Sequence, residues 1–365
     1  MAIASEICVV TINGTVFRDW ETVRAEAEVS GNALRIVTLT ITEKVSDGQA
    51  PSGSVAQALQ IMPGTETMAS VTLGGVLFCN GNVYERQASY DANNHGVRII
   101  ICGLPLPLIK SAVPLKNGQF KGYSFQAIAS SVLQPFGLNL KIASLPPGFD
   151  KPFRYVATIP GEPAWTFLER LARLRGAAMT DDEFGNVVIH GQAQTTPVGD
   201  LVEGGNILSA NCVMQYPQAS GIEVTAQQKG SDTITPDQAR APAASGAITG
   251  MGSNRPSLLH TEDAGDGDDA RRRAQAEQMA NLAPVTTAQI VVQGWLRPSG
   301  DLWSIRDLVT VNSPMLALNV GLYVVKTVFS QDTSGTLTTL ELSRYPGEGA
   351  TPDVSSGAQS PQVLT

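Results

Sequence analysis

Residues 22–42 decide the fold class of this chain, and they read TVRAEAEVSGNALRIVTLTIT. In Val23–Val29, small apolar residues alternate with charged ones, which is typical of a β-strand with one buried face. Gly31-Asn32 is a turn signal. Leu34–Thr42 alternates again but is partly apolar on both faces, which suits a strand in a barrel or at an interface. The stretch therefore predicts two strands joined by a turn.

Strand and turn signals also surround this stretch. Asn13-Gly14 tolerates the positive φ angles of a tight hairpin and separates Ile7–Ile12 from Thr15–Trp20. We expect further strands at Thr67–Leu73 and Val97–Cys102. A second hairpin is expected from Val76–Phe78 through Asn80-Gly81 to Val83–Tyr90. Roughly seven strands with turns about every ten residues indicate an antiparallel barrel or sandwich, which we assign to residues 1–104.

The period changes in the middle of the chain. Apolar residues recur every three or four positions in Ser124–Phe136, which predicts an amphipathic helix. A second helix is expected between Gly161-Glu162-Pro163 and Gly176, since proline suits a first turn and glycine ends helices. Asp181–Asn186 is expected to be a turn before a strand at Val187–His190. Residues 105–195 therefore form an expected α+β domain with two helices.

Strand patterns return in residues 196–228 and 285–345, which we expect to form a second β-barrel domain. The expected strands are Asn206–Tyr216, Gly221–Gln227, Thr286–Gly294, Leu308–Asn312, Gly321–Ser330 and Thr336–Arg344. Between them, residues 229–284 form an expected insertion, with a loop over Lys229–Leu258 and a helix over Asp266–Ala283. Residues 346–365 are rich in Pro, Gly and Ser and are expected to be a flexible tail. The predicted fold class is mainly β with α+β insertions.

Composition excludes several functional classes. At about 150 residues a domain, 365 residues make roughly two to three domains. The net charge is −8 and only 16% of residues are charged, which disfavours general nucleic-acid binding. The apolar stretch Arg98–Ile109 is too short to span a bilayer. Met1–Val10 has no basic residue, which argues against a secretory signal. The cysteines form no CxxC pair and are expected to be buried free thiols: Cys8, Cys79, Cys102 and Cys212.

The sequence offers few candidates for chemistry. His95 in an expected turn, His190 at a strand end and His260 are widely separated, which favours ordinary histidines over metal ligands. Asp263–Asp269 lacks the register of a calcium loop and is better explained as helix capping. Arg271–Arg273 is expected to be a solvated or interfacial face rather than a phosphate site.

A glycosidase-like carboxylate pair is the one catalytic arrangement worth testing. Its candidates are Glu162, Glu169, Asp181 and Asp182. Asp181 and Asp182 fall in an expected turn and Glu169 on a polar helix face, so we predict no catalytic residue, and also no cofactor and no metal. Trp295 and Trp303 lie beside turns and are expected to be core residues rather than partner anchors.

A series of loose motifs over residues 1–345 follows an order that is found in one protein family. In this order the chain resembles the Mu-like baseplate hub proteins of contractile-tail phages, also described as the tail hub or late control protein D-like family. The motifs are Ile61–Gly64, Val76–Phe78, Tyr90, Val97–Gly103, Phe120–Phe136, Pro160–Trp165, Arg175-Gly176, Asp182–Ile189, Gln293–Trp295, Gly300–Trp303, Val309–Ser313 and Gly335–Leu340. The chain departs from the family at Gly103-Leu104-Pro105, where the family often has Gly-Arg and a small polar residue.

The resemblance implies two similar antiparallel β-barrel domains plus two smaller domains. It also implies a homotrimer whose six barrels form a pseudo-sixfold ring, joining a threefold membrane-piercing spike to a sixfold tail tube. Implied partners are the tail spike protein, the tube or tube-initiator protein and other baseplate proteins, in a virion assembled in the host cytoplasm. Such a protein is not an enzyme, does not insert into membranes and binds no nucleic acid stably, although DNA passes through the ring. An acidic ring would repel that DNA. The tail could dock on a partner or remain solvated.

Two alternatives stay open. A related bacterial contractile injection system uses a corresponding hub, and the sequence does not separate the two. A peptidoglycan hydrolase of the tail tip is the enzymatic alternative, and it requires a cleft with paired acids.

Overall fold

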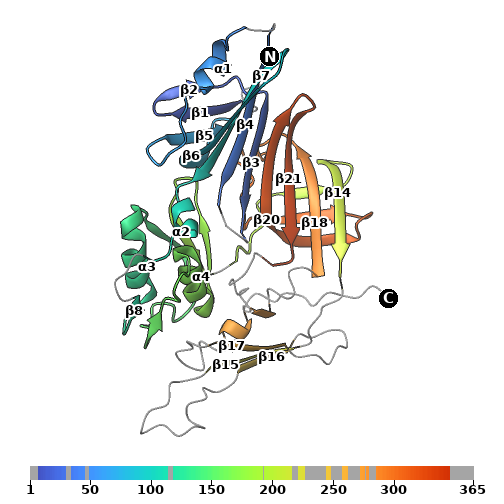
Figure 1. The fold of residues 1–365 in the computed structure, drawn as a ribbon. Coiled ribbons are helices and arrows are strands. Elements are labelled where there is room, and N and C mark those ends of the chain that lie inside the picture. The colour runs from blue at the N-terminus through green and yellow to red at the C-terminus, as the bar shows by residue number, and fades with distance from the viewer. Residues whose placement is uncertain are drawn as a thin grey trace, which may run out of the picture.

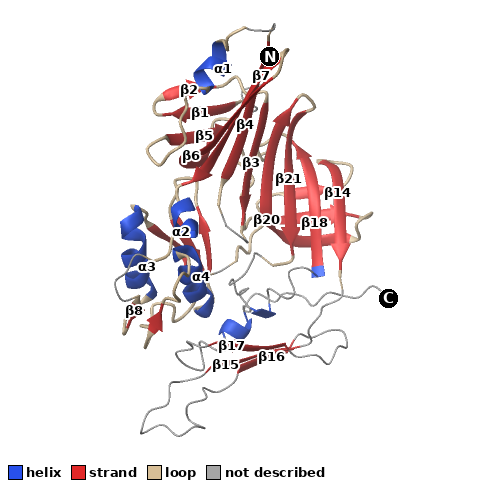
Figure 2. Ribbon diagram, in the orientation of Figure 1, coloured by secondary structure: helices blue, strands red, loops and turns tan. Residues whose placement is uncertain are grey.

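The computed structural model describes residues 7–29, 34–45, 49–113, 118–191, 193–215, 221–226, 244–247, 257–261, 272–275, 277–278 and 285–345. The fold is mainly β, as predicted, and its largest element is a 13-stranded sheet. The helices α2, α3 and α4 lie together below the N-terminal strands (Figure 2). The fold therefore consists of an extended sheet with a helical part beside it.

The first part of the sheet is the N-terminal sheet region. Its strands are β1 (Cys8–Ile12), β2 (Thr15–Phe17), β3 (Thr22–Glu28), β4 (Ile36–Lys44), β5 (Met68–Leu73), β6 (Val76–Tyr90) and β7 (Asn94–Gly103). The predicted hairpin at Asn13-Gly14 is confirmed, with φ angles of 47° and 84°. The predicted alternation in β3 is also confirmed, because Val23, Ala25 and Ala27 are buried while Arg24 is exposed.

The second hairpin, predicted to turn at Asn80-Gly81, is wrong. β6 runs through these residues without interruption, and the chain turns earlier at Gly74-Gly75, where φ is 58° and 84°. Gly81 is required for a different reason. A Cβ atom there would overlap the carbonyl oxygen of Cys102 on β7, so this glycine permits close approach of two strands.

The second part of the sheet is the C-terminal sheet region. Its strands are β13 (Asp200–Val202), β14 (Ile207–Met214), β18 (Thr286–Gln293), β19 (Leu308–Ser313), β20 (Leu318–Asp332) and β21 (Gly335–Ser343). The predicted strands β14, β18, β19, β20 and β21 are confirmed, although β20 is longer than predicted, whereas β13 was not predicted. Figure 1 shows β14, β18, β20 and β21 side by side in yellow to red.

The two sheet regions repeat one pairing pattern, as expected for two similar β domains. In the first, the neighbours run β3-β4-β7-β6-β5-β1; in the second, they run β14-β18-β21-β20-β19-β13. β6 and β20 each have 15 residues. Both carry one register shift against the following strand, at Val83/Glu85 and at Val324/Lys326. The regions differ at one place, since β1 is antiparallel to β5 whereas β13 is parallel to β19.

The helical module has a hydrophobic core of its own. Its elements are α2 (Leu106–Lys110), β8 (Gln119–Phe120), α3 (Phe125–Leu133), the 3-10 helix Gln134–Phe136, β9 (Leu140–Ser144), β10 (Val156–Ala157), α4 (Ala164–Leu174), β11 (Ala178–Asp181) and β12 (Val187–His190). α3 and α4 confirm the two predicted helices, and Ser124 caps α3 by accepting a hydrogen bond from Ala127. The short helix α2 was not predicted, and neither was α1 (Gly53–Ala58) in the N-terminal sheet region.

Three short strands form a separate sheet: β15 (Gly221–Ala226), β16 (Ala244–Ala247) and β17 (Ser257–Thr261). The prediction of a loop over Lys229–Leu258 is therefore wrong at β16 and at the start of β17. The sequence of β16, ASGA, has no apolar period, so its strand state comes from pairing with β15. Residues 272–275 and 277–278 are helical, in agreement with the helix predicted over Asp266–Ala283. The rest of that helix and the tail 346–365 lie outside the described residues.

Candidate functional site

The two sheet regions are joined by a pair of strands that we call the seam. Residues Val23–Glu28 of β3 pair antiparallel with Lys326–Gln331 of β20, and the N–H of Val29 donates to the carbonyl of Val325 at 2.9 Å. The seam makes one sheet and one core out of both regions. The aromatic rings of Phe78 and Phe329, one from each region, pack edge to face with centroids 5.6 Å apart.

The polar face of the seam carries a charge cluster. The ammonium group of Lys326 lies 3.3 Å from a carboxylate oxygen of Glu28 and 3.6 Å from one of Glu26. Partial burial lowers the pKa of Lys326, but the two carboxylates outweigh burial and the pKa is raised. These groups are partly exposed, so they specify the register of the seam more than they stabilise it.

A buried ion pair attaches the helical module to the N-terminal sheet region. A guanidinium nitrogen of Arg35, just before β4, lies 2.6 Å from Oδ1 of Asp181 at the end of β11. The backbone N–H of Arg35 donates to Oδ2 of the same carboxyl at 3.1 Å. Burial raises the pKa of Asp181 to about 6, although the charge of Arg35 opposes this. The placement of Asp181 in a turn is therefore wrong, because it ends a strand and is buried.

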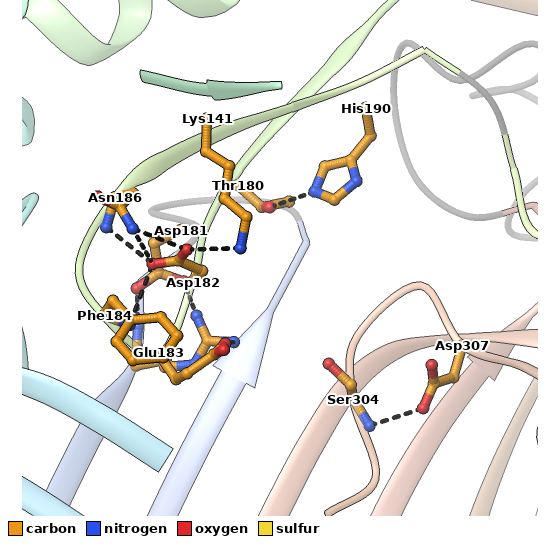
Figure 3. A network of polar contacts seen from close by, with 11 residues as sticks. Lys141, Thr180, Asp181, Asp182, Glu183, Phe184, Asn186, His190, Ser304 and Asp307 are labelled. Atoms are coloured by element: carbon orange, nitrogen blue, oxygen red, sulfur yellow. Dashed lines mark hydrogen bonds and ion pairs between the residues drawn. The ribbon is translucent and has the colours of Figure 1, made fainter. Parts of the chain in front are cut away.

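Asp182, the next residue, organises the turn that follows. Figure 3 shows Lys141 and Asn186 pointing toward its carboxyl group. Oδ1 accepts hydrogen bonds from the backbone N–H groups of Phe184 and Asn186, and Oδ2 lies 3.2 Å from the Lys141 ammonium. Burial raises the pKa of Asp182, but the hydrogen bonds from Asn186 and the contact with Lys141 prevail and the pKa is lowered. This aspartate is ionised and structural.

The turn is also fastened to the sheet by backbone and packing contacts. The N–H of Asn80 on β6 donates to the carbonyl of Glu183 at 2.8 Å. Gly185 has φ of +85°, and a Cβ atom there would lie 2.7 Å from Leu104. Leu104, where the family often has Arg, thus covers the turn with an apolar side chain. A cavity of about 220 Å³ lies beside this turn, and its lining includes Arg35, Glu183 and Trp303.

His190 ends β12, as predicted, and faces inward. Its Nε2 lies 2.8 Å from the hydroxyl of Thr180, and Figure 3 shows the ring directed at that residue. Burial lowers the pKa of His190 to about 3, and the positive charges of Arg306 and Lys141 act in the same direction. The imidazole is therefore neutral at physiological pH.

The candidate carboxylates do not form a catalytic pair. Glu162 lies 3.0 Å from the guanidinium of Arg170 and accepts a hydrogen bond from the N–H of Ile159. Glu169 lies 3.9 Å from Arg173, one turn along α4. Asp181 is paired with Arg35, and Asp182 accepts the hydrogen bonds that form the following turn. All four acids therefore make structural contacts. General acid-base work requires a carboxyl group that can reach a substrate.

The remaining candidates are structural or lie outside the described residues. His95 lies in β7 rather than in a turn, with Nδ1 3.0 Å from Glu43. Arg273 pairs with Glu277 one turn along the same helical segment, and Arg272 packs against Gly176 within the chain. Arg271 and Asp263–Asp269 are not described. His260 is placed in β17 by its backbone alone.

Both tryptophans are core residues, as predicted. Trp295 is fully buried and its Nε1–H donates to the carbonyl of Ser330 at 3.2 Å, while Trp303 packs in the same core. All four cysteines are free; three are buried as predicted, whereas Cys212 on β14 is partly exposed. No three His, Cys, Asp or Glu side chains of the described residues gather as metal ligands. In the same part of the chain, no helix is long and apolar enough to cross a membrane.

Sequence reasoning missed the Arg35–Asp181 pair. Its partners are far apart in the chain, so no local pattern links them. One signal was present, because Arg35 occupies the same face of its strand as Val37 and Leu39, both fully buried. A charge in an apolar register needs a buried counter-ion.

Comparisons with known proteins match this fold to baseplate hub proteins of phage tails. Residues 107–191 match the second domain of gp44-like baseplate hub proteins, and residues 267–351 match the fourth domain of the Mu phage baseplate assembly protein GpP. Baseplate hub protein gp44 of Escherichia phage Mu is 24% identical over 319 residues, which cover 82% of each chain. The predicted resemblance to Mu-like baseplate hub proteins is confirmed.

Solved structures show the same fold. The 43 kDa tail protein of prophage MuSo2 from Shewanella oneidensis has a TM-score of 0.78 and 23% identity, covering 94% of this chain and 99% of that one. A tail protein from Neisseria meningitidis MC58 has a TM-score of 0.74 and 17% identity, with the same coverage. The E. coli c3393 protein, a component of the type VI secretion system, has a TM-score of 0.57 and 10% identity, covering 93% and 78%.

Proposed function

We propose that this chain is the structural hub of a contractile-tail baseplate. Three copies form a pseudo-sixfold ring that joins a threefold membrane-piercing spike to a sixfold tail tube. The observation that carries this proposal is the seam, which holds two sheet regions with one pairing pattern side by side in one sheet. A threefold assembly of such chains presents six quasi-equivalent positions, and closed rings of this kind use head-to-tail contacts.

The domain organisation follows from this proposal. Residues 1–104 and residues 196–215 with 285–345 are the two ring-forming domains, and residues 105–195 are an α+β domain outside the ring. Within the predicted segment 196–228, β15 instead joins the sheet of the insertion with β16 and β17. The insertion 229–284 and the tail 346–365 complete the chain. The separate core of the helical module supports its independence from the sheet.

The partners belong to the same proposal: the spike protein, the tube or tube-initiator protein and other baseplate proteins, in a virion assembled in the host cytoplasm. The net charge of −8 supports passage of DNA without stable binding. The chain does not act as an enzyme in this scheme, since the candidate acids hold Arg35, Lys141, Arg170 and Arg173. A peptidoglycan zymogram with the purified protein is expected to show no clearing.

The mass of the native protein in solution tests the ring. We expect native mass spectrometry to give three chains and negative-stain images to show an open annulus. A chain that remains a monomer at high concentration contradicts the proposal. The type VI component with this fold supports a corresponding hub of a bacterial injection system as the second candidate, and the genes beside the coding sequence separate the two.

A further inference from the structure

We infer that neighbouring copies join edge to edge, β14 of one copy pairing antiparallel with the outer half of β6 of the next, residues 85–90. This inference rests on the proposed ring and names the surfaces that close it. It follows from the internal repeat, because the seam inside each chain is a template for the contact between chains.

The repeat fixes which strands correspond. In the pairing order, β3 takes the place of β14, and β6 takes the place of β20. The seam joins β3 to β20. If all six sheet regions of a ring occupy quasi-equivalent positions, the contact between copies joins the two counterparts, β14 and β6.

Both counterparts have a free edge in the described part of the chain. β14 pairs with β18 on one side only, and it is the first strand of the 13-stranded sheet. β6 pairs with β5 only as far as Asn82, so its outer half from Glu85 to Tyr90 pairs with β7 alone. An unpaired edge is a template for another strand, and both edges lie where the repeat requires them.

The bulges fix the register. Since the shifts at Val83/Glu85 and Val324/Lys326 correspond, Ala88 takes the place of Phe329, at the same distance beyond the shift. Following the pairings outward gives three further equivalences: Ile101 with Leu342, Val37 with Ala288, and Ala25 with Cys212. In the seam, Phe329 lies opposite Ala25. Between copies, Ala88 therefore lies opposite Cys212.

The side chains suit this register. The buried face of β3, made by Val23, Ala25 and Ala27, corresponds to the neutral residues Ala210, Cys212 and Met214 on β14. Met214 is 55% exposed in the single chain and Tyr90 of β6 is 86% exposed. Opposite this face the register places Tyr90, Ala88 and Arg86. Pairing would cover apolar surface that the isolated chain leaves in water.

Arg86 is accommodated as well. One guanidinium nitrogen donates to the carbonyls of Leu59 and Ile61 in the same chain, which holds the charged end of Arg86 against its own subunit. Its aliphatic stem is then available to pack opposite Met214. The other face of the pairing is mostly polar, with Ser89 opposite Asn211 and Glu85 opposite Gln215.

A cysteine placed opposite Cys212 tests the register. Directly opposed residues of antiparallel strands have Cα atoms about 4.5–5.5 Å apart, within the range of a disulfide. We expect Ala88→Cys, mildly oxidised, to run as a covalent trimer on a non-reducing gel, and a reductant to reverse it. Gln87→Cys is the matched control, because it projects from the opposite face of β6 and should not link. Cys212→Ser added to Ala88→Cys should abolish the link.

A second variant tests the interface without a cross-link. Met214→Asp is expected to weaken trimer formation at least tenfold, whereas Val16→Asp, at a position of similar exposure on β2, should leave it unchanged. A trimer by native mass that neither forms the Ala88–Cys212 link nor responds to Met214→Asp overturns this inference and leaves the ring intact. A monomeric wild-type chain overturns the ring itself.

Discussion

At the residue scale, His190 makes stability depend on pH. The unfolded chain binds a proton at this position near pH 6.5, whereas burial keeps the folded pKa near 3. Stability is therefore full above pH 6.5 and falls as the pH falls, by about 1.4 kcal/mol per pH unit. We expect wild type to lose about 2 kcal/mol more than His190→Gln between pH 6.5 and 5. Urea unfolding at several pH values measures this difference, and identical pH profiles for the two proteins contradict the assignment.

The ion pair between Arg35 and Asp181 gives a second prediction at this scale. Asp181→Ala leaves a buried guanidinium without its counter-ion, which costs about 3–5 kcal/mol of unfolding free energy. Glu183→Gln is the control, since that carboxylate is 38% exposed and 4.0 Å from Arg35. Its expected cost is below about 1 kcal/mol. Equal losses in the two variants, measured by urea unfolding, would mean that the pair does not hold the module.

Residue patterns predicted burial well but not partners. The alternation in β3 and the apolar environment of Trp295 follow from local sequence, because each depends on neighbours in the chain. The pairing of Arg35 with Asp181 depends on two segments that meet only in the tertiary fold. The sequence predicts a turn at Asp181 for the same reason, since its strand β11 is defined by pairing with β12.

At the element scale, the role of Gly81 is to let two strands approach closely, and a substitution at this position tests that role. Gly81→Ala places a methyl group against the Cys102 carbonyl and must push β6 from β7, so we expect a loss of at least about 3 kcal/mol or failure to fold. Gly64→Ala is the control, because its Cβ would meet nothing nearer than 4.0 Å. We expect it to stay within about 0.5 kcal/mol of wild type. Thermal unfolding measures both, and a tolerated Gly81→Ala would contradict the close approach of β6 to β7 at this glycine.

The sequence predicts the helices that are long enough to show a repeated apolar period, and it misses the short ones. α3 and α4 carry an unbroken apolar stripe, and their bounds match the prediction within a few residues. α1 and α2 span 6 and 5 residues, too few for a helical period to appear. The sequence predicts a turn at Asn80-Gly81 because the dipeptide permits one. What decides the matter is the partner strand, which sequence spacing does not show.

At the scale of the whole molecule, the described residues form two separate hydrophobic cores. The sheet core takes residues from both sheet regions, whereas the helical module keeps its own. The resemblance implied two similar β domains, and the repeated pairing pattern agrees with it. The seam that fuses them was not foreseen, because β3 and β20 are separated by most of the chain and neither carries a motif for the other.

Because the two cores are separate, we expect the helical module and the sheet to unfold locally with different free energies. Phe125 is fully buried in the helical module, and Phe125→Ala should leave a cavity costing about 3–5 kcal/mol. Amides of α3, α4 and β12 should then exchange faster, while those of β18 and β21 keep their protection. Phe329→Ala is the matched variant. Because Phe329 contacts Phe78 across the seam, it should speed exchange in both sheet regions together. Hydrogen exchange followed by mass spectrometry measures both patterns. If Phe125→Ala deprotects β18 and β21 as strongly as α3, the chain opens as one unit, and the helical module is not a separate body beside the sheet.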